Sequence, residues 1–127
     1  MNTRGYQYYR EDALNSLTQG EQLIKLYDGL AKKLTQAELF LQKEDYESFE
    51  SAVDRSLDII HYLSDTLDHR YEISTSLARL YEFFCYELSR VKAGRNRKEL
   101  ERVKTMVSEL RESFRQADKT AGAAADR

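Results

Sequence analysis

The sequence contains no proline among its 127 residues and only one cysteine, Cys85. Proline interrupts helices and punctuates loops and edge strands, so its absence favours long helices joined by short connections. A single cysteine cannot form an internal disulfide, which agrees with a reducing compartment. No apolar run is long enough for a transmembrane helix, and residues 1–6 lack the apolar stretch of a secretory signal. These absences predict a cytoplasmic protein that does not insert into a membrane.

Charge and motif content argue against several classes of function. The net charge of -2 comes without a broad basic bias, which argues against nucleic acid as a partner. A di-iron helix bundle needs two Glu-x-x-His motifs, whereas the chain offers Asp58 before His61, so we expect His61 to face solvent. Cys85 stands among aromatic residues and is expected to be a packed side chain rather than a nucleophile. We therefore predict no enzymatic activity, no metal and no cofactor.

Apolar residues recur at spacings of three and four in four segments, which predicts four amphipathic helices. The predicted ranges are 18–43, 46–67, 73–93 and 97–117. Because the connections are short, successive helices must be antiparallel neighbours, and the sequence predicts an all-α, antiparallel up-down four-helix bundle with an N-terminal arm. The core-facing stripe of the third helix is predicted to be Ile73, Leu77, Leu80, Phe84, Leu88 and Val91.

Capping residues mark the ends of these helices. Thr18 and Glu21 form a capping box at the start of the first helix. Asp45 is placed to cap the second helix, and Asn96 to begin the fourth. Gly94 is predicted to stop the third helix, because glycine adopts the left-handed conformation that ends many helices.

The bundle is expected to be flanked by two segments of different character. An N-terminal arm, residues 1–17, is polar but carries Tyr6, Tyr8 and Tyr9. Aromatic rings bury a large area when they dock, whereas chain termini often fray, and both interpretations of the arm remain open. The bundle domain spans residues 18–117, and residues 118–127, with their alanine and glycine run, are predicted to form a disordered tail.

The first and third helices carry more apolar residues than one core-facing stripe can use. On the first helix the stripe through Leu23, Tyr27 and Leu30 leaves other apolar positions outside it. Such a surplus, rich in aromatic residues, marks a binding groove more often than chance exposure. The surplus residues are Ile24, Leu26, Ala31, Leu39 and Phe40 on the first helix, and Tyr81, Phe83, Cys85 and Tyr86 on the third.

Two further features each allow two interpretations. Gly29 lies inside a helix, where glycine costs about 1 kcal/mol relative to alanine, so another backbone is expected to approach it closely. That backbone could belong to a neighbouring helix or to a bound peptide. A basic cluster around the third connection could touch acidic partners, although interruption by Glu99 and Glu101 favours a solvated turn. Its members are Arg90, Lys92, Arg95, Arg97, Lys98, Arg102 and Lys104.

Several motifs, in order, resemble those of a known family. The run Leu26-Tyr27-Asp28-Gly29 inside the apolar first helix is similar to a signature of the flagellar FliS family, the export chaperones for flagellin. Gly20-Glu21 stands just before that helix, and the later run Leu80-Tyr81-Glu82-Phe83 is similar to a second family element. The likeness spans roughly residues 6–116. The sequence departs from the family pattern at Phe114, where tryptophan is common, and at Thr18-Gln19 and Tyr71-Glu72.

The resemblance implies a cytosolic chaperone that holds the C-terminal segment of flagellin, prevents its premature polymerisation and works with the flagellar export apparatus. In such a family the N-terminal arm can cover part of the same surface, a role expected here of Tyr6 and Tyr9. The alternative from another class is a homodimeric helical interaction module with no flagellin role, in which the surplus surface joins two copies. The residues expected to bind flagellin are Ile24, Leu26, Tyr27, Gly29, Leu30, Lys33, Leu80, Tyr81, Phe84 and Cys85.

Overall fold

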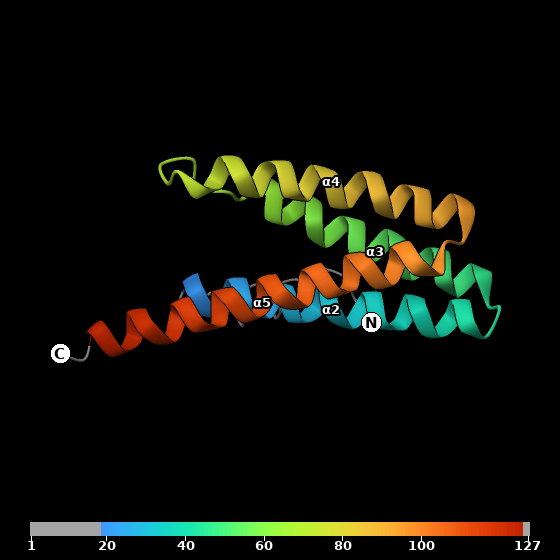
Figure 1. The fold of residues 1–127 in the computed structure, drawn as a ribbon, viewed down its shortest axis with the longest axis horizontal. Helices are drawn as coiled ribbons and strands as arrows, with labels where there is room; N and C mark the ends of the chain where they lie inside the picture. The colour runs from blue at the N-terminus through green and yellow to red at the C-terminus, as the bar shows by residue number, and fades with distance from the viewer. Residues whose placement is uncertain (1–18, 126–127) are drawn as a thin grey trace, which may run out of the picture.

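The computed structural model describes the backbone of residues 19–125 and the side chains of residues 19–120. Within this part of the chain lie four helices and no strand: α2 (Gln19–Gln42), α3 (Tyr46–Asp65), α4 (Ile73–Gly94) and α5 (Arg97–Ala125). Successive helices run in opposite directions along one long axis, with the connections at the two ends (Figure 1). The structure confirms the predicted all-α, up-down four-helix bundle. The arm, with Tyr6 and Tyr9, and the capping residue Thr18 lie outside the described residues.

Each helix has two neighbours and one diagonal partner. Both α2 and α4 pack against α3 and α5, so α2 and α4 face each other across the bundle axis. The order follows from the short connections, which leave each helix beside the next one in the chain. Within the described residues, none of the helices combines the length and apolar character needed to cross a membrane.

The helix ends confirm some predicted caps and correct others. The Asp45 carboxylate accepts a hydrogen bond from the Ser48 backbone N–H at 3.2 Å, and the Asn96 side chain accepts one from Glu99 N–H at 3.2 Å. Helix α4 ends at Gly94, as expected, but the left-handed residue is Arg95, with φ 53° and ψ 42°. The glycine therefore does not supply the conformation that we expected of it.

Helix α5 is longer than the sequence predicted. It continues past the predicted end at Ala117 to Ala125, so the segment expected to be a disordered tail is helical through Ala125. Alanine has the highest helix propensity of all residues, and the sequence interpretation gave too much weight to one glycine among the alanines. In Figure 1 this end of α5 extends beyond the packed part of the bundle.

The core contains apolar side chains from all four helices. Tyr27 and Leu34 of α2, Phe49 of α3, Phe84 of α4 and Val103 of α5 are fully buried. Burial of such side chains is worth roughly 1.5–3 kcal/mol each and dominates the stability of the bundle. In the predicted stripe of α2, Tyr27 and Leu30 are fully buried and Leu23 is partly buried, whereas Ala31, predicted to lie outside the stripe, is 7% exposed and belongs to the core.

The predicted stripe of α4 is wrong at two positions. Ile73 is 58% exposed, because it is the first residue of the helix and projects at the end of the bundle. Leu80 is only partly buried, whereas Tyr81, which we placed outside the stripe, is 2% exposed. The side of α4 that faces the core is therefore rotated toward Tyr81. The spacing of an aromatic residue fits either a core or a binding surface, and here the core uses Tyr81.

Candidate functional site

Four consecutive residues of α2 point in four directions, and together they define the site. Tyr27 is fully buried, whereas Leu26 is a partly buried residue packed against the core. Asp28 contacts α5 through two arginines. Gly29 faces α3, where Ile59 is its nearest neighbour. Successive residues on a helix are separated by about 100°, so a run of four visits every side of α2.

Tyr27 joins three helices. Its hydroxyl lies 2.5 Å from the hydroxyl of Tyr81 on α4, in a buried hydrogen bond in which either oxygen could donate. Its ring stacks on Phe114 of α5, with centroids 5.3 Å apart. Burial, with the neighbouring Tyr81 as a smaller cause, raises the pKa of Tyr27 far above its ordinary value, and burial also raises the pKa of Tyr81. Both phenols are neutral structural groups.

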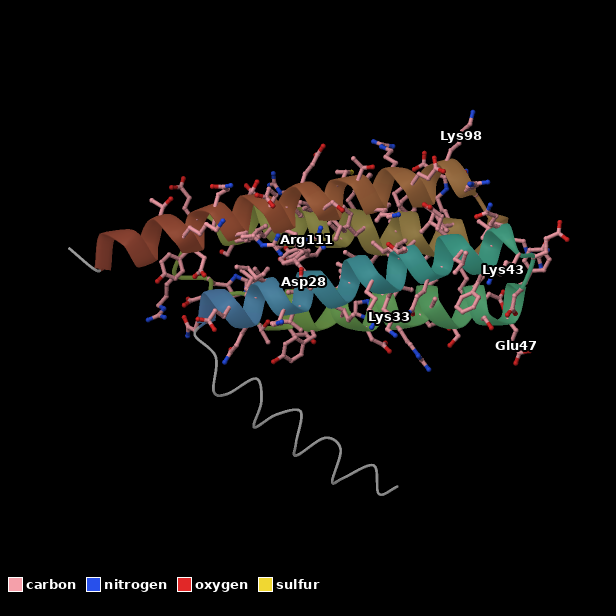
Figure 2. The ribbon with its side chains drawn as sticks, turned by 90° about the horizontal axis from the view of Figure 1, so that it is seen from below. Asp28, Lys33, Lys43, Glu47, Lys98 and Arg111 are labelled. Atoms are coloured by element: carbon pink, nitrogen blue, oxygen red, sulfur yellow. The ribbon has the colours of Figure 1, made fainter. Side chains whose placement is uncertain are left out.

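Asp28 connects α2 to α5. One oxygen of its carboxylate lies 3.5 Å from Arg111 Nη1 and 3.4 Å from Arg115 Nη2. Figure 2 shows Asp28 directed toward Arg111, while Lys33 lies at the opposite edge of α2. The side chains are between 31% and 39% exposed, so the contribution of each pair to stability is modest. These ion pairs place α5 against one side of α2 and leave the other side to α3.

Gly29 belongs to a row of α2 residues that faces α3. Leu26, Gly29, Lys33, Gln36 and Phe40 are spaced by three and four, so they lie along one edge of the helix. A Cβ atom built at Gly29 would have only one neighbour from other elements within 4 Å, Ile59 Cδ1 at 3.9 Å, which is an ordinary contact. No neighbouring helix backbone approaches closely enough to require glycine. Close approach of a neighbouring helix therefore does not explain Gly29. Of the two explanations, a bound peptide remains.

The opposing row on α3 completes a groove, which we call the α2–α3 groove. Gln36 and Phe40 line a hollow of about 320 Å³ together with Ser48, Ala52 and Arg55. Ile59 and Tyr62 continue the same edge of α3 toward the other end of the bundle, and Tyr62 is 52% exposed. The groove is defined by Leu26, Gly29, Lys33, Gln36 and Phe40 of α2 and by Ser48, Ala52, Arg55, Ile59 and Tyr62 of α3.

Two cations, Lys33 and Arg55, lie along this groove. Lys33 Nζ donates a hydrogen bond to the Gln36 side chain at 3.3 Å, and neither Lys33 nor Arg55 forms an ion pair with a described carboxylate. Glu47 lies at the end of the groove, in the lining of the hollow. The groove therefore offers an apolar floor with two cations on its rim. That arrangement fits an amphipathic segment with apolar residues on one side and carboxylates beside them.

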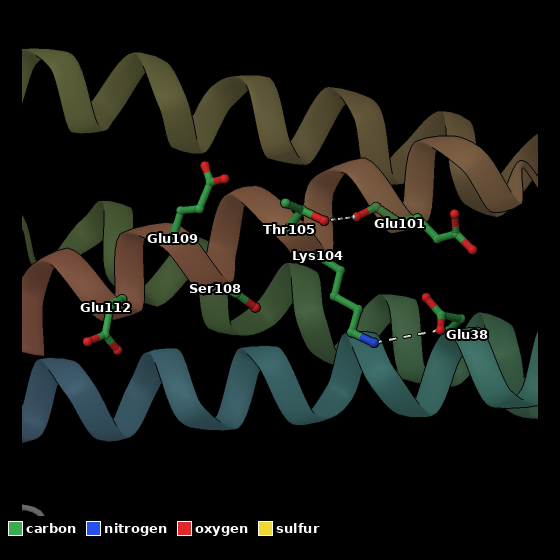
Figure 3. Close-up of a pocket in the computed structure, with 7 residues that line it drawn as sticks. All are labelled: Glu38, Glu101, Lys104, Thr105, Ser108, Glu109 and Glu112. Atoms are coloured by element: carbon green, nitrogen blue, oxygen red, sulfur yellow. Dashed lines mark hydrogen bonds and ion pairs between the residues drawn. The ribbon is translucent and has the colours of Figure 1, made fainter.

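A second hollow, between α2 and α5, has a different character. It measures about 530 Å³ and is lined by charged or polar residues from both helices. Lys104 Nζ lies 3.6 Å from the Glu38 carboxylate, which bridges the two helices across it (Figure 3). Asp28 and its two arginines form further polar contacts along the same seam. The side chains that line this hollow are all charged or polar.

The residues predicted to bind a partner do not come together. Tyr27, Leu30, Tyr81 and Phe84 are at most 2% exposed and cannot touch a partner while the bundle is folded. Leu26, Gly29 and Lys33 lie in the α2–α3 groove. The binding role of all of these residues stays a prediction.

The remaining three predicted residues lie along other seams. Ile24 precedes Asp28 by four residues and shares its side of α2, next to α5. Leu80 precedes Phe83 by three residues, and Phe83 lies beneath Arg102 of α5. Cys85 is half-buried on the side of α4 where Lys92 meets α3, and burial raises the pKa of its thiol, so it is not an activated nucleophile.

Sequence reasoning missed the α3 wall of the groove. Arg55, Ile59 and Tyr62 follow one another at spacings of four and three, parallel to the row on α2. This spacing was available in the sequence as a second apolar edge beside the core stripe of α3. The sequence-based prediction of the binding residues included none from this edge of α3. His61 is exposed, as predicted, and the described side chains contain no group of three residues placed to hold a metal ion.

Comparison with known proteins covers nearly the whole chain. A model of the family described as flagellar protein FliS matches residues 1–121. The chain is 26% identical over 112 residues to the flagellar secretion chaperone FliS of Bacillus subtilis strain 168, which covers 88% of this chain and 84% of that protein. It is 28% identical over 109 residues to the flagellar secretion chaperone FliS of Salmonella typhimurium strain LT2, covering 84% and 81% of the two chains.

Proposed function

This chain belongs to the FliS family of flagellar proteins, and from that membership we propose that it is a cytoplasmic secretion chaperone for flagellin. It binds the C-terminal segment of flagellin, prevents premature polymerisation and hands the segment to the flagellar export apparatus. The two relatives named flagellar secretion chaperone support the general role. The mechanism is binding rather than catalysis.

Gly29 is the residue that supports one particular surface as the binding site. A glycine in the middle of α2 lowers helix stability by about 1 kcal/mol relative to alanine, and no contact within the part of the chain that the structure describes requires it. A backbone that approaches from outside the bundle would require it, because any side chain there would hold that backbone away. We therefore propose the α2–α3 groove as the place where flagellin binds.

The groove explains which part of a partner would fit. Leu26, Phe40 and Ile59 are partly buried apolar residues packed against the core, so an apolar face laid over them would complete their burial. Lys33 and Arg55 would pair with carboxylates at the edges of the same segment. A segment that is disordered when free must be ordered on binding, so a long contact is needed to offset that loss of entropy.

Binding in the α2–α3 groove would explain how polymerisation of flagellin is prevented. A flagellin segment whose apolar face is covered by the α2–α3 groove cannot present that face to another flagellin molecule. Release at the export apparatus would expose it again. Of the ten residues expected from the sequence to bind flagellin, Leu26, Gly29 and Lys33 would touch the segment in this groove, and Tyr27, Leu30, Tyr81 and Phe84 would support it from the core.

Calorimetric titration of a flagellin C-terminal peptide into the full chain tests the proposal. We expect a complex at micromolar concentration, and we expect Tyr62→Ala to weaken it at least about ten-fold, since exposed tyrosines are common interface anchors. Tyr71→Ala is the matched control, because Tyr71 is 64% exposed but lies in the connection before α4.

Two results would count against it. Absence of heat and of a complex at micromolar concentration would remove flagellin as the partner, and equal affinity of the two tyrosine variants would remove this groove as the site. Mass measured in solution with and without the peptide addresses the homodimer alternative. A stable dimer that the peptide does not disturb would favour an interaction module joined through its own surplus surface.

A further inference from the structure

Helix α4 carries a second organised surface, away from the α2–α3 groove. Arg79, Phe83, Tyr86 and Arg90 are spaced by four, three and four, so they form one row along the helix. Tyr86 is 63% exposed, and Arg79 and Arg90 are exposed at the two ends of the row. We call these four residues, with Arg102 of α5, the α4 row. Because α2 and α4 lie diagonally across the bundle, the row does not belong to the proposed flagellin groove.

Two arginines of the row are held against its aromatic rings. Arg90 Cζ lies 5.8 Å from the centroid of Tyr86, and Arg102 Cζ lies 5.5 Å from the centroid of Phe83. Both distances are within the range in which a cation is attracted to the ring. The guanidinium groups are therefore oriented before any partner arrives, which lowers the entropy lost when they bind.

The same arginines keep hydrogen-bond donors available. Arg90 lies 3.7 Å from the Glu87 carboxylate and Arg102 lies 3.6 Å from that of Glu99, distances that are too long for hydrogen bonds. The Glu87 side chain is only 8% exposed, whereas that of Arg90 is 60% exposed, so the cation rather than the carboxylate reaches the surface. A partner carboxylate could take up these donors in a bidentate pair.

The composition of the row is that of a protein interface. Tyrosine, phenylalanine and arginine are enriched at interfaces, and tyrosine and arginine supply many of the residues that dominate binding energy. From Arg79 to Arg90 the row extends about 16 Å along the helix, which matches three turns of a partner helix. Glu82 and Glu109 are exposed at its margins, so the carboxylates of a partner would have to lie over the arginines and away from these two residues.

We propose that the α4 row is a docking surface for an acidic amphipathic helix of a protein partner. Apolar side chains of that helix would cover Tyr86 and Phe83, and its carboxylates would pair with Arg79, Arg90 and Arg102. The proposal is independent of the flagellin groove, so the protein could hold a partner on α4 while a flagellin segment occupies the other side of the bundle.

A designed helix can serve as the probe. It would be an 18-residue capped peptide with leucine along one face and glutamate on both flanks, added to the isotopically labelled full chain and followed by NMR. We expect shifts centred on the α4 row, and affinity that falls at least about five-fold in Tyr86→Ala and in Arg90→Gln. Tyr71→Ala and Arg70→Gln, at exposed residues of the connection before α4 that belong to neither surface, are matched controls that should bind the acidic helix as the wild type does.

Each alternative gives a distinct result that would overturn the docking surface. The first is equal affinity for the same peptide with lysine in place of glutamate. The second is tighter binding of a single-stranded RNA than of the acidic helix. The third is the absence of NMR shifts at millimolar concentrations of the acidic helix. Competition between the acidic helix and the flagellin C-terminal peptide would show that the two share one site, and would also remove the α4 row. Simultaneous binding of both peptides would support the docking surface on α4. This result supports it even if the flagellin peptide binds outside the α2–α3 groove.

Discussion

The hydroxyl of Tyr27 on α2 and the hydroxyl of Tyr81 on α4 lie 2.5 Å apart in the centre of the bundle. The two helices are diagonal partners, so this bond crosses the bundle axis. Two buried phenols satisfy each other, and burial raises the pKa of both. The pair therefore links the two diagonal helices within the core.

Removing both hydroxyls of this pair should cost less than the sum of the two single removals. Tyr27→Phe or Tyr81→Phe alone leaves a buried hydroxyl without a partner, which should lower the free energy of unfolding by about 1–3 kcal/mol. The double variant leaves no unpaired hydroxyl, so its loss should be smaller than the sum of the two. Urea denaturation of the four proteins forms a double-mutant cycle. Additive losses would show that the bond contributes nothing of its own, and Tyr71→Phe serves as the exposed control.

Gly29→Ala should make the free protein more stable and the complex weaker. Alanine raises helix propensity by about 1 kcal/mol, and its methyl group would meet Ile59 at an ordinary contact distance. The same methyl would hold a bound backbone away and should weaken the flagellin peptide at least about ten-fold. Thermal unfolding and calorimetry measure the two effects. Gly94→Ala, where an added Cβ would meet no described side chain or other element within 4 Å, should leave affinity unchanged. A Gly29→Ala protein with wild-type affinity would mean that no backbone approaches there.

Asp28→Asn should weaken the attachment of α5 to α2. The carboxylate serves Arg111 and Arg115 at once, but all three side chains are about one-third exposed, so we expect a loss of no more than about 1 kcal/mol. High salt screens such pairs, and the difference from wild type should shrink in about 1 M sodium chloride. Urea titrations at two salt concentrations check this, with Asp58→Asn on the exposed side of α3 as control. A loss that salt does not change would point to packing instead.

Glu87→Gln should change how stability depends on pH. A hydrogen bond with Glu99, then burial and the Glu99 charge, raise the pKa of Glu87, while Arg90 and Arg102 act in the opposite direction. The pKa of Glu87 in the folded protein lies above its value in the unfolded chain, which is about 4.3. At pH values between these two pKa values, folding is therefore accompanied by uptake of a proton. The stabilising contribution of the protonated pair is present below the unfolded pKa and is lost as pH rises through the folded pKa.

Glutamine does not titrate, so the variant should gain stability relative to wild type as pH rises from acidic to neutral values. Urea denaturation at several pH values from about 4 to 8 would measure this difference. Glu109→Gln, on the exposed side of α5, is the control and should follow the wild-type profile. Parallel profiles for wild type and Glu87→Gln would show that the carboxylate pair does not share a proton in the folded state.

The sequence predicted the architecture well because its signals are local and repeated. Spacings of three and four gave the four helices, and Asp45 and Asn96 were placed correctly as caps. The incorrect predictions are those that depended on the character of a single residue and not on a repeated pattern. Gly94 was expected in the left-handed conformation that Arg95 adopts, and Ile73 was assigned to the core although it projects at the end of α4. Tyr81 was read as surplus because an aromatic residue fits either a groove or a core.

The candidate site was predicted less well than the fold. Leu26, Gly29 and Lys33 were chosen from the apolar surplus of α2 and do share one groove, but four of their companions are buried and the α3 wall was missed. Periodicity indicates that a helix has two apolar sides. It does not say which side is covered by a neighbour, because that depends on the rotation of each helix about its axis.

The sequence by itself determined that this chain forms four antiparallel helices and that α2 carries more apolar surface than one interface needs, since both follow from the order of residues along a helix. Only the tertiary structure decided that Asp28 pairs with two arginines of α5, and that Gly29 faces α3, where a Cβ atom would meet only Ile59 among the described residues of other elements. The physical reason is that side-chain burial is a property of neighbours distant in sequence. Arg111 and Arg115 come from the far end of the chain, and no local pattern around Asp28 indicates that they will reach it.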